Sequence, residues 1–385
     1  MKKIINNARI SAGRGSTLLL IILLLLSTGC EKFLDDLGDH FHKNKRNQKY
    51  LKGFEQINLV GNNDDYHPAR IDPNLINGWG IAFSPTGVPW INSFGKGLSL
   101  IYNAEGLELR APVAVPSPTA ATGGLPTGIV FNGTTDFMLA NGQPARFIFC
   151  GADGIISGWN AGTSDLAPRV VNQSATSAYT GLALASDNGA NYLYATDYRA
   201  RKIDVFDRSF ALVSGRSFVD PGLPAGYAPF NIENIGGKLY VLYAKVGPDG
   251  RDDPAVGNGY VSLFETNGQF IRRFASRGHL NSPWGIALAP AGFFLGDANS
   301  PGSQSDGTAP TAILIGNFGD GYIHAYATDG TFLGALQDNG YPLKIDGLWA
   351  IKFPPATATT VDLNRLYFAA GPEEEVEGLF GYITK

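Results

Sequence analysis

Short hydrophobic runs of about five residues, set between glycine, proline and polar residues, recur along most of the chain. The second residue of each run falls at position 80, 128, 181, 231, 285 or 350, so neighbouring runs are about 50 to 65 residues apart. Strand-length runs at such a period are typical of a repeat architecture. The six runs are Trp79–Phe83, Thr127–Phe131, Thr180–Leu184, Phe230–Asn234, Trp284–Leu288 and Trp349–Phe353.

Each run is followed by further strand patterns, which complete a unit of four. A second hydrophobic run comes next, as in Tyr192–Thr196, and a third run ends in a turn such as Thr266-Asn267-Gly268. Glycine at such a turn supplies the positive φ that a tight hairpin needs. A fourth run, such as Gln269–Phe274, closes the unit. The pattern predicts an all-β fold, a six-bladed β-propeller with four antiparallel strands per blade.

The two ends of the repeat region complement each other. The sixth unit reaches only its third strand before the chain ends at Lys385, and an additional strand, Gln56–Val60, precedes the first unit. We therefore expect the N-terminal strand to complete the last blade and remove an exposed edge. This predicts one propeller domain over residues 55–385. Glycine at the second position of four runs is expected where inner strands approach closely near the axis.

The N-terminal segment has the pattern of a lipoprotein signal. Residues 1–30 carry four basic residues and no acid, and the nonapeptide Leu18–Leu26 is too short to span a membrane. Small residues precede Cys30, although Ser27 stands where such signals usually have leucine. We expect Cys30 to be lipidated and residues 31–54 to form a tether. The protein is then expected in the cell envelope, anchored at the outer membrane. An ordinary secretory signal with an incidental cysteine is the alternative.

Charge and cysteine content narrow the function classes. Removing the leader's four basic residues from the 30 Lys and Arg leaves 26 against 34 Asp and Glu, a formal charge of −8. That balance argues against nucleic acid as a partner. With Cys30 lipidated, Cys150 is the single remaining cysteine, so no disulfide framework is expected. Cys150 ends a hydrophobic run and is interpreted as a buried, inert thiol.

Several motifs together resemble an uncharacterised bacterial family of secreted proteins, and more distantly the blades resemble NHL-type six-bladed propellers. Some members of that family carry a C-terminal sorting tail, where this chain has Cys30 instead. The resemblance implies a secreted propeller and no particular activity. The motifs are Asp72–Pro85, Pro126–Gly133, Asp153–Asn160, Gly316–Gly321 and Asp346–Trp349.

Ligands of propellers usually bind the face formed by the loops after the second and fourth strands of each blade. On this chain that face is predicted to be polar and mostly acidic. Trp79, Trp284 and Trp349 recur at one repeat position, which favours packing between blades over stacking on a sugar. The ligand-face candidates are His67, Asp72, Asn77, Asp197, Arg199, Lys245, His279 and Glu373.

A metal site is a further hypothesis. Lactonase-like and arylesterase-like six-bladed propellers hold a divalent cation with Asp, Asn and Glu oxygens, and this resemblance suggests calcium at Asn92, Asp197 and Asn317. The alternative is that these residues cap turns at strand ends. The acidic loop Gly247–Pro254 supplies Asp249, Asp252 and Asp253 as a second candidate, with a solvated acidic loop as its alternative.

The sequence contains no assembled catalytic motif. It has no Gly-x-Ser-x-Gly elbow, and the propeller region holds only three histidines. The first hypothesis is therefore a lipid-anchored binding or scaffolding module outside the cytoplasm, whose ligand is a protein, peptide or glycan of unknown identity. The alternative is a metal-dependent, calcium-type hydrolase or lactonase with His67 or His279 as its base.

Overall fold

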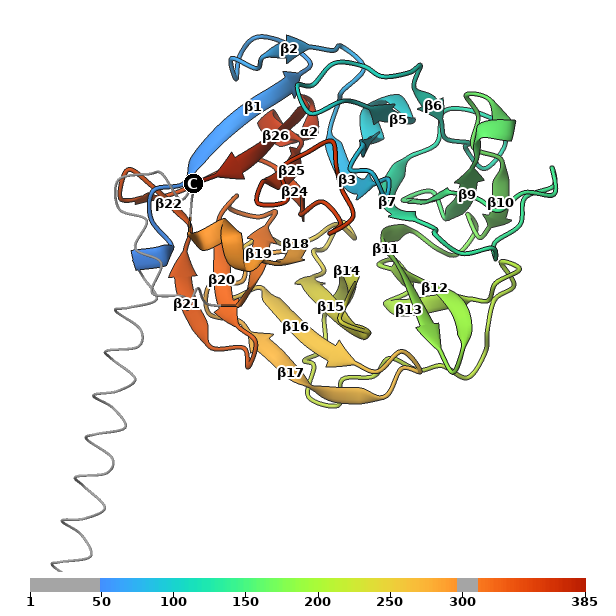
Figure 1. Cartoon of the computed structure of the whole chain (residues 1–385). Coiled ribbons are helices and arrows are strands. Elements are labelled where there is room, and N and C mark those ends of the chain that lie inside the picture. The colour runs from blue at the N-terminus through green and yellow to red at the C-terminus, as the bar shows by residue number, and fades with distance from the viewer. Residues whose placement is uncertain (1–48, 296–310) are drawn as a thin grey trace, which may run out of the picture. The chain divides into compact units, whose positions relative to one another are not determined.

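The structure is a computed structural model of the chain that describes residues 49–295 and 311–385. In the unit Tyr50–Lys385, small antiparallel sheets are arranged in a ring around a central axis (Figure 1). The predicted all-β, six-bladed propeller is confirmed. Cys30, the predicted lipidation site, and most of the predicted tether lie outside the described residues.

Blades one to three follow the chain from the first hydrophobic run. In blade three the fourth strand is reduced to a bridge between Phe206 and Leu212. Blade one contains β3 (Gly78–Phe83), β4 (Pro89–Ser93), β5 (Leu98–Ile101) and β6 (Val113–Ala114); blade two contains β7 (Pro126–Phe131), β8 (Phe147–Gly151), β9 (Ile155–Trp159) and β10 (Arg169–Asn172); blade three contains β11 (Tyr179–Asp187), β12 (Ala190–Asp197) and β13 (Lys202–Phe206).

Blades four to six repeat the same order, and short helical turns interrupt the loops. Blade four contains β14 (Tyr227–Ile235), β15 (Lys238–Lys245), β16 (Gly259–Phe264) and β17 (Phe270–Ser276); blade five contains β18 (Pro283–Leu288), β19 (Ala312–Asn317), β20 (Ile323–Ala327) and β21 (Phe332–Ala335); blade six contains β24 (Leu348–Lys352), β25 (Leu366–Ala370) and β26 (Leu379–Thr384). The turns are η1 (Phe94–Lys96), η2 (Ala161–Thr163), η3 (Ala291–Phe294) and α2 (Pro372–Glu375). One two-stranded sheet, formed by β22 (Gln337–Asp338) and β23 (Tyr341–Pro342), precedes blade six.

The N-terminal strand completes blade six, as predicted. Strand β1 (Glu55–Gly61) pairs antiparallel with β26, and the register joins Glu55 to Thr384 and Gly61 to Leu379. A short parallel strand, β2 (Arg70–Ile71), then covers the outer edge of β1. The first and last strands of the propeller therefore share one sheet, so the edge that β26 would otherwise expose is paired.

The buried chain begins earlier than the predicted boundary at residue 55. Tyr50, Leu51 and Phe54 are all buried, and Phe54 stacks on Phe293 of blade five with ring centroids 4.8 Å apart. The Leu51 carbonyl also accepts a hydrogen bond from the Gln337 backbone nitrogen at 2.7 Å. These residues are part of the propeller unit and not of a free linker, because their apolar side chains are removed from water.

Close packing of the inner strands explains the recurrent glycine. A Cβ on Gly80 would lie 2.3 Å from the Thr127 carbonyl oxygen, and one on Gly128 would lie 2.6 Å from the Leu182 nitrogen. In all six blades the register between the first and second strands also shifts at the start of the hydrophobic run. Such a bulge bends the strand and re-aims the side chains next to it.

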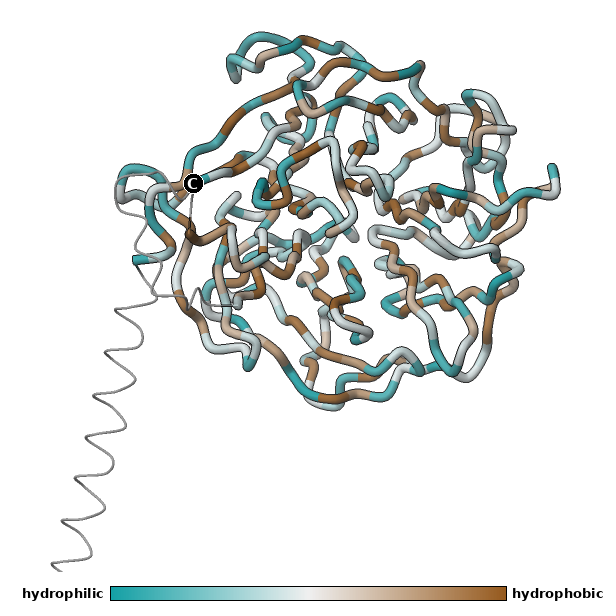
Figure 2. Tube along the Cα trace, viewed as in Figure 1, coloured by the Kyte–Doolittle hydropathy of each residue, from teal (hydrophilic) through white to brown (hydrophobic). Residues whose placement is uncertain are grey.

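Hydrophobic residues follow the strands, and most loops are polar (Figure 2). The core is divided into clusters, several of which combine residues of neighbouring blades. Cys150 lies inside one such cluster, and burial raises the pKa of its thiol to about 12. No helix of the described residues is long and apolar enough to cross a membrane.

Candidate functional site

Three tryptophans meet near the axis of the propeller and form a tryptophan cluster. Trp79 and Trp349 stack with ring centroids 3.6 Å apart, and Trp284 meets both edge-on at 6.4 and 6.0 Å. Phe318 stacks on Trp349 at 3.9 Å. The three indoles are at most 6% exposed. Their recurrence in the sequence therefore reflects packing across the central axis, where bulged inner strands bring one position from three blades together.

A pocket lies over this cluster on the upper face, which we define as the face of the loops after the second and fourth strands. Its volume is about 440 Å³, within the range of small-molecule sites. Aromatic side chains line one part of it, and polar groups from the loops of blades four and six line the other. The lining residues are Asn77, Trp79, Phe94, Gly95, Ala152, Thr180, Tyr198, Phe230, Gly250, Arg251, Asp252, Trp349, Glu374 and Glu375.

One ion pair joins two loops at this pocket. Arg251, in the loop after the second strand of blade four, binds the carboxylate of Glu375 in the corresponding loop of blade six. Arg251, Glu374 and Glu375 also border a second hollow of about 330 Å³, to which Asp346 and Phe318 contribute. The pair therefore stands between two neighbouring cavities of the upper face.

Asn77 connects this carboxylate to the tryptophan cluster. Its Nδ2 donates to Glu375 Oε2 at 2.7 Å, and its Oδ1 accepts from Trp349 Nε1 at 2.8 Å. Asn77 is 1% exposed and has a φ of 48°, an uncommon value for a residue other than glycine. The chain Arg251–Glu375–Asn77–Trp349 thus fixes polar groups of three blades around one pocket.

The loop that carries Glu375 is strained. Glu373, Glu374 and Glu375 have φ values of 52°, 56° and 72°, so three consecutive glutamates adopt the left-handed region. Each such residue costs of the order of 1 kcal/mol and persists only where the surroundings hold it. Strain of this kind is concentrated at ligand clamps and active sites. Its effect here is to direct Glu375 into the pocket, while Glu373 and Glu374 remain exposed.

Burial changes the acidity of two carboxyl groups in the pocket. It raises the pKa of Glu375, against the opposing effects of Arg251 and the Asn77 hydrogen bond. It also raises the pKa of Asp252, whose Oδ2 is buried without a hydrogen-bond partner among the described residues. Groups whose pKa is perturbed by burial and by specific charges in a cavity are candidates for function.

One predicted ligand-face residue, Asn77, and one residue of the predicted acidic metal loop, Asp252, line the upper pocket. Glu373 lies one residue away from it and accepts a hydrogen bond from the Tyr66 hydroxyl at 3.2 Å. Lys245 forms an ion pair with Asp253 at 2.6 Å, and Asp249 Oδ1 accepts from the Arg251 backbone nitrogen. These contacts stabilise the blade-four loop that presents Arg251.

The other ligand-face residues lie elsewhere. Asp72 accepts a hydrogen bond from the Tyr102 hydroxyl at 2.8 Å, and His67 and Arg199 are exposed and do not line the upper pocket. His279 stacks on Phe332 at 4.0 Å, beside His324 at 5.5 Å. None of the histidines in residues 49–295 and 311–385 therefore lines the upper pocket.

The three residues proposed to hold calcium, which lie in blades one, three and five, each bind backbone groups. Asn92 Nδ2 donates to the Thr127 carbonyl at 3.0 Å, and Asp197 Oδ1 accepts from the backbone nitrogens of Ala178 and Ala200. Asn317 Nδ2 donates to the His279 carbonyl at 2.8 Å. Asp197 and Asn317 therefore bind backbone groups of adjacent loops, as turn-capping residues do, whereas Asn92 links blade one to β7 of blade two. Asn92 Oδ1 and Asp197 Oδ2, however, are buried without a hydrogen-bond partner in the described part of the chain.

Arg251, Glu375 and Tyr198 are the pocket residues that sequence reasoning undervalued. Glu373–Glu375 were recognisable as an acidic run near the channel, but nothing in that run distinguishes the half-buried Glu375 from its exposed neighbours. No group of three or more His, Cys, Asp or Glu side chains suited to a metal ion occurs in residues 49–295 and 311–385.

Comparisons with known proteins place the chain in a family. Uncharacterized protein R648 of Acanthamoeba polyphaga mimivirus is 34% identical over 344 residues, which covers 86% of this chain and 80% of the relative. Uncharacterized protein L690 of the same virus is 34% identical over 346 residues and 86% of each chain. The chain belongs to the family of these proteins. No family model matches it.

These relatives are viral, whereas the sequence motifs resemble a bacterial secreted family, so the bacterial assignment stays a prediction. Among solved structures, a streptogramin B lyase aligns over 86% of this chain and 97% of its own length, with a TM-score of 0.50 and 12% identity. At that identity the likeness shows the fold alone, which is that of a six-bladed propeller.

Proposed function

We propose that the protein is a lipid-anchored binding module outside the cytoplasm, and that its upper pocket receives a basic side chain of a peptide or partner protein. The observation that carries this proposal is the charge of the pocket and its neighbouring hollow. Among the described residues, four acidic side chains and one basic side chain border them, namely Asp252, Asp346, Glu374 and Glu375 against Arg251. A surplus of carboxylates at the mouth of a preformed cavity favours a cationic partner.

The rigidity of the site supports recognition. Asn77 and Arg251 hold Glu375 in place before any ligand arrives, and the tryptophan cluster gives the pocket a fixed apolar floor. Preorganised polar groups reduce the entropy lost on binding. The exposed Glu374 remains free to meet an incoming cation, whereas Glu375 is already paired and sets the shape of the cavity.

Calorimetry with short peptides tests the proposal. Peptides that contain lysine or arginine should bind, and matched peptides with glutamate in the same positions should not. Glu374→Gln should weaken binding severalfold, and 0.5 M salt should weaken it further because the contact is exposed to screening. Glu105→Gln, on an exposed hairpin of blade one, is the matched control. Equal binding of acidic and basic peptides would refute the proposed specificity.

The anchor needs its own experiment. Cys30→Ala should move the protein from the membrane fraction to the soluble fraction, and mass spectrometry of the wild-type N-terminus should detect an acylated cysteine. Cleavage at another residue, with an unmodified Cys30, would replace the lipid anchor by ordinary secretion. This result would leave the assignment of the upper pocket unchanged.

The calcium-type hydrolase or lactonase is the alternative, and one observation favours it. Asn92 Oδ1 and Asp197 Oδ2 are buried acceptors without partners among the described residues, and such oxygens are suited to bind a calcium ion. Elemental analysis of protein purified without chelator discriminates the two functions. One equivalent of calcium that is lost in Asp197→Ala would favour the hydrolase. Metal-free protein that binds basic peptides would favour the binding module.

A further inference from the structure

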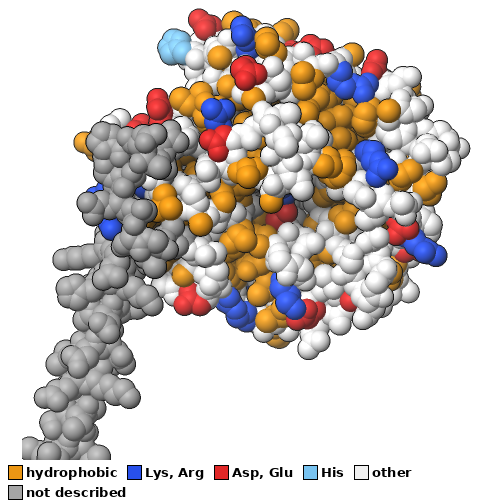
Figure 3. Space-filling model, in the orientation of Figure 1, with side chains coloured by type: hydrophobic (Ala, Val, Ile, Leu, Met, Phe, Trp, Pro, Cys, Tyr) orange, Lys and Arg blue, Asp and Glu red, His pale blue; other side chains and the backbone are white. Residues whose placement is uncertain are grey.

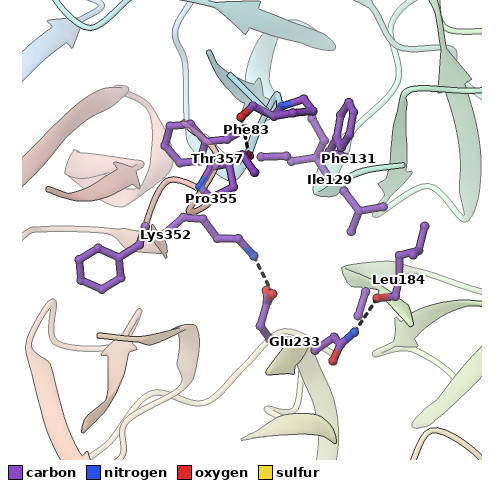
Figure 4. Close-up of a pocket in the computed structure, with 14 residues that line it drawn as sticks. Phe83, Ile129, Phe131, Leu184, Glu233, Lys352, Pro355 and Thr357 are labelled. Atoms are coloured by element: carbon purple, nitrogen blue, oxygen red, sulfur yellow. Dashed lines mark hydrogen bonds and ion pairs between the residues drawn. The ribbon is translucent and has the colours of Figure 1, made fainter. Parts of the chain in front are cut away.

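A second cavity of about 460 Å³ opens on the lower face, which is formed by the loops after the first and third strands. Its walls are mainly apolar and include Phe83, Ile129, Phe131 and Leu184, from three consecutive blades (Figure 4). Hydrophobic side chains gather around a hollow in the middle of the face seen in Figure 3. This cavity shares no lining residue with the upper pocket, to which the proposed function is assigned.

Two charged side chains stand in this apolar wall. Lys352 Nζ lies 2.6 Å from Glu233 Oε1, and their side chains are 33% and 24% exposed. They extend toward each other from blades six and four (Figure 4). Both also border the narrow space deeper in the channel, so the pair lies where the lower cavity meets the channel.

The repeat itself indicates that the fold does not need these charges. They occupy the fourth position of the inner-strand run, which is alanine or valine in the other four blades. A partly buried ion pair adds little net stability over apolar residues of similar size. A small number of polar groups in a mainly apolar cavity is instead typical of ligand sites. The six residues at this position are Ala82, Val130, Ala183, Glu233, Ala287 and Lys352.

The opposite charges of Lys352 and Glu233 restrict which charged groups a ligand can carry. An anionic head group that binds Lys352 would lie beside the Glu233 carboxylate, and a cationic one that binds Glu233 would lie beside the Lys352 ammonium. A zwitterion satisfies both, because its carboxylate pairs with Lys352 while its ammonium pairs with Glu233. The rest of the ligand must be apolar to pack against Phe83, Phe131 and Leu184.

We propose that the lower cavity binds a zwitterionic α-amino acid with a large apolar side chain. The α-ammonium and α-carboxylate insert into the Lys352–Glu233 pair and exchange one ion pair for two. The side chain fills the space between the inner-strand ends of blades one to three. The phenyl group of phenylalanine suits a cavity lined by Phe83 and Phe131, since aromatic rings favour offset or edge-to-face contact.

Calorimetric or NMR titration of the full-length protein with L-phenylalanine tests this site. Two analogues separate the charges: 3-phenylpropanoate keeps only the carboxylate, and 2-phenylethylamine keeps only the ammonium. We expect phenylalanine to bind at least about tenfold more tightly than either analogue, which corresponds to about 1.4 kcal/mol. Glycine, which has the zwitterion without the apolar side chain, should bind weakly.

Protein variants provide the second arm. Lys352→Met and Glu233→Gln should each weaken phenylalanine binding about tenfold or more. Lys238→Met is the matched control, because Lys238 forms a similar pair with Glu265 and does not line the cavity. Circular dichroism verifies that each variant is folded. Equal affinity for phenylalanine and its single-charge analogues, or no binding at about 1 mM, would overturn the proposal, and both results come from the wild-type protein.

Discussion

Arg251 and Glu375 are 124 residues apart in the sequence and form an ion pair between the blade-four and blade-six loops of the upper face. The arginine side chain is 67% exposed, whereas that of the glutamate is 16% exposed. The buried partner therefore bears most of the desolvation cost, which is why its pKa is raised although a guanidinium is in contact with it.

The raised pKa of Glu375 predicts a specific pH dependence. The folded state holds the Glu375 proton more tightly than the unfolded state, so this residue favours folding more as the pH falls from 7 toward 4.5. The difference in unfolding free energy between wild type and Glu375→Gln should shift in favour of wild type over that interval. Urea unfolding at several pH values measures it, with exposed Glu374→Gln as control. A constant difference would contradict the burial of this carboxyl group.

For the buried His324 we expect the opposite pH dependence of stability. Burial, helped by His279 and opposed by Asp320, lowers its pKa to about 4. In the unfolded chain His324 therefore binds a proton near pH 6.5, whereas in the folded protein it stays neutral down to about pH 4. Stability should consequently fall as the pH drops from about 6.5 to about 4. The loss approaches about 3 kcal/mol. His324→Phe should abolish most of this sensitivity, as measured by thermal unfolding across that range, and an unchanged slope would count against it.

The close contact at Gly80 predicts that a larger side chain there lowers the stability of the protein. A methyl group there would meet the Thr127 carbonyl oxygen at 2.3 Å, so Gly80→Ala should destabilise the protein by about 1–3 kcal/mol. Gly133→Ala is the control, because its added carbon would lie 3.6 Å from Phe131, an ordinary contact. Denaturant midpoints compare the two variants. Similar midpoints would mean that the inner strands can move apart without penalty.

Substitution of Trp349 measures how much the tryptophan cluster contributes to the free energy of unfolding. It is 2% exposed, lies between Trp79 and Phe318, and donates to Asn77. Trp349→Ala should cost about 3–5 kcal/mol because it leaves a cavity. Trp349→Phe, which keeps an aromatic ring and loses the hydrogen bond, should cost less. If both variants unfold at the wild-type denaturant concentration, the cluster contributes little to stability.

The sequence was sufficient to predict the ring and much less of the pocket. Glycine and tryptophan recur because every blade places the same position at the crowded axis, so a one-dimensional period reflects a three-dimensional constraint. The pairing of β1 with blade six was predictable because the sixth unit of the sequence lacks a fourth strand. The pair Arg251–Glu375 has no such periodicity. It depends on loops of unequal length and on three glutamates with positive φ, and neither leaves a pattern along the chain.

The pairing of β1 with β26 also has a consequence for biosynthesis. Glu55 lies in the first strand of the propeller and Thr384 in the last, yet they are partners in one sheet. The ring therefore cannot close while the ribosome is still adding blades, and the first strand must wait, unpaired, until the last one has emerged. Contacts this distant in sequence form slowly. During that interval the edge of β1 is unpaired, which is the stage at which pairing with the strands of another chain is expected.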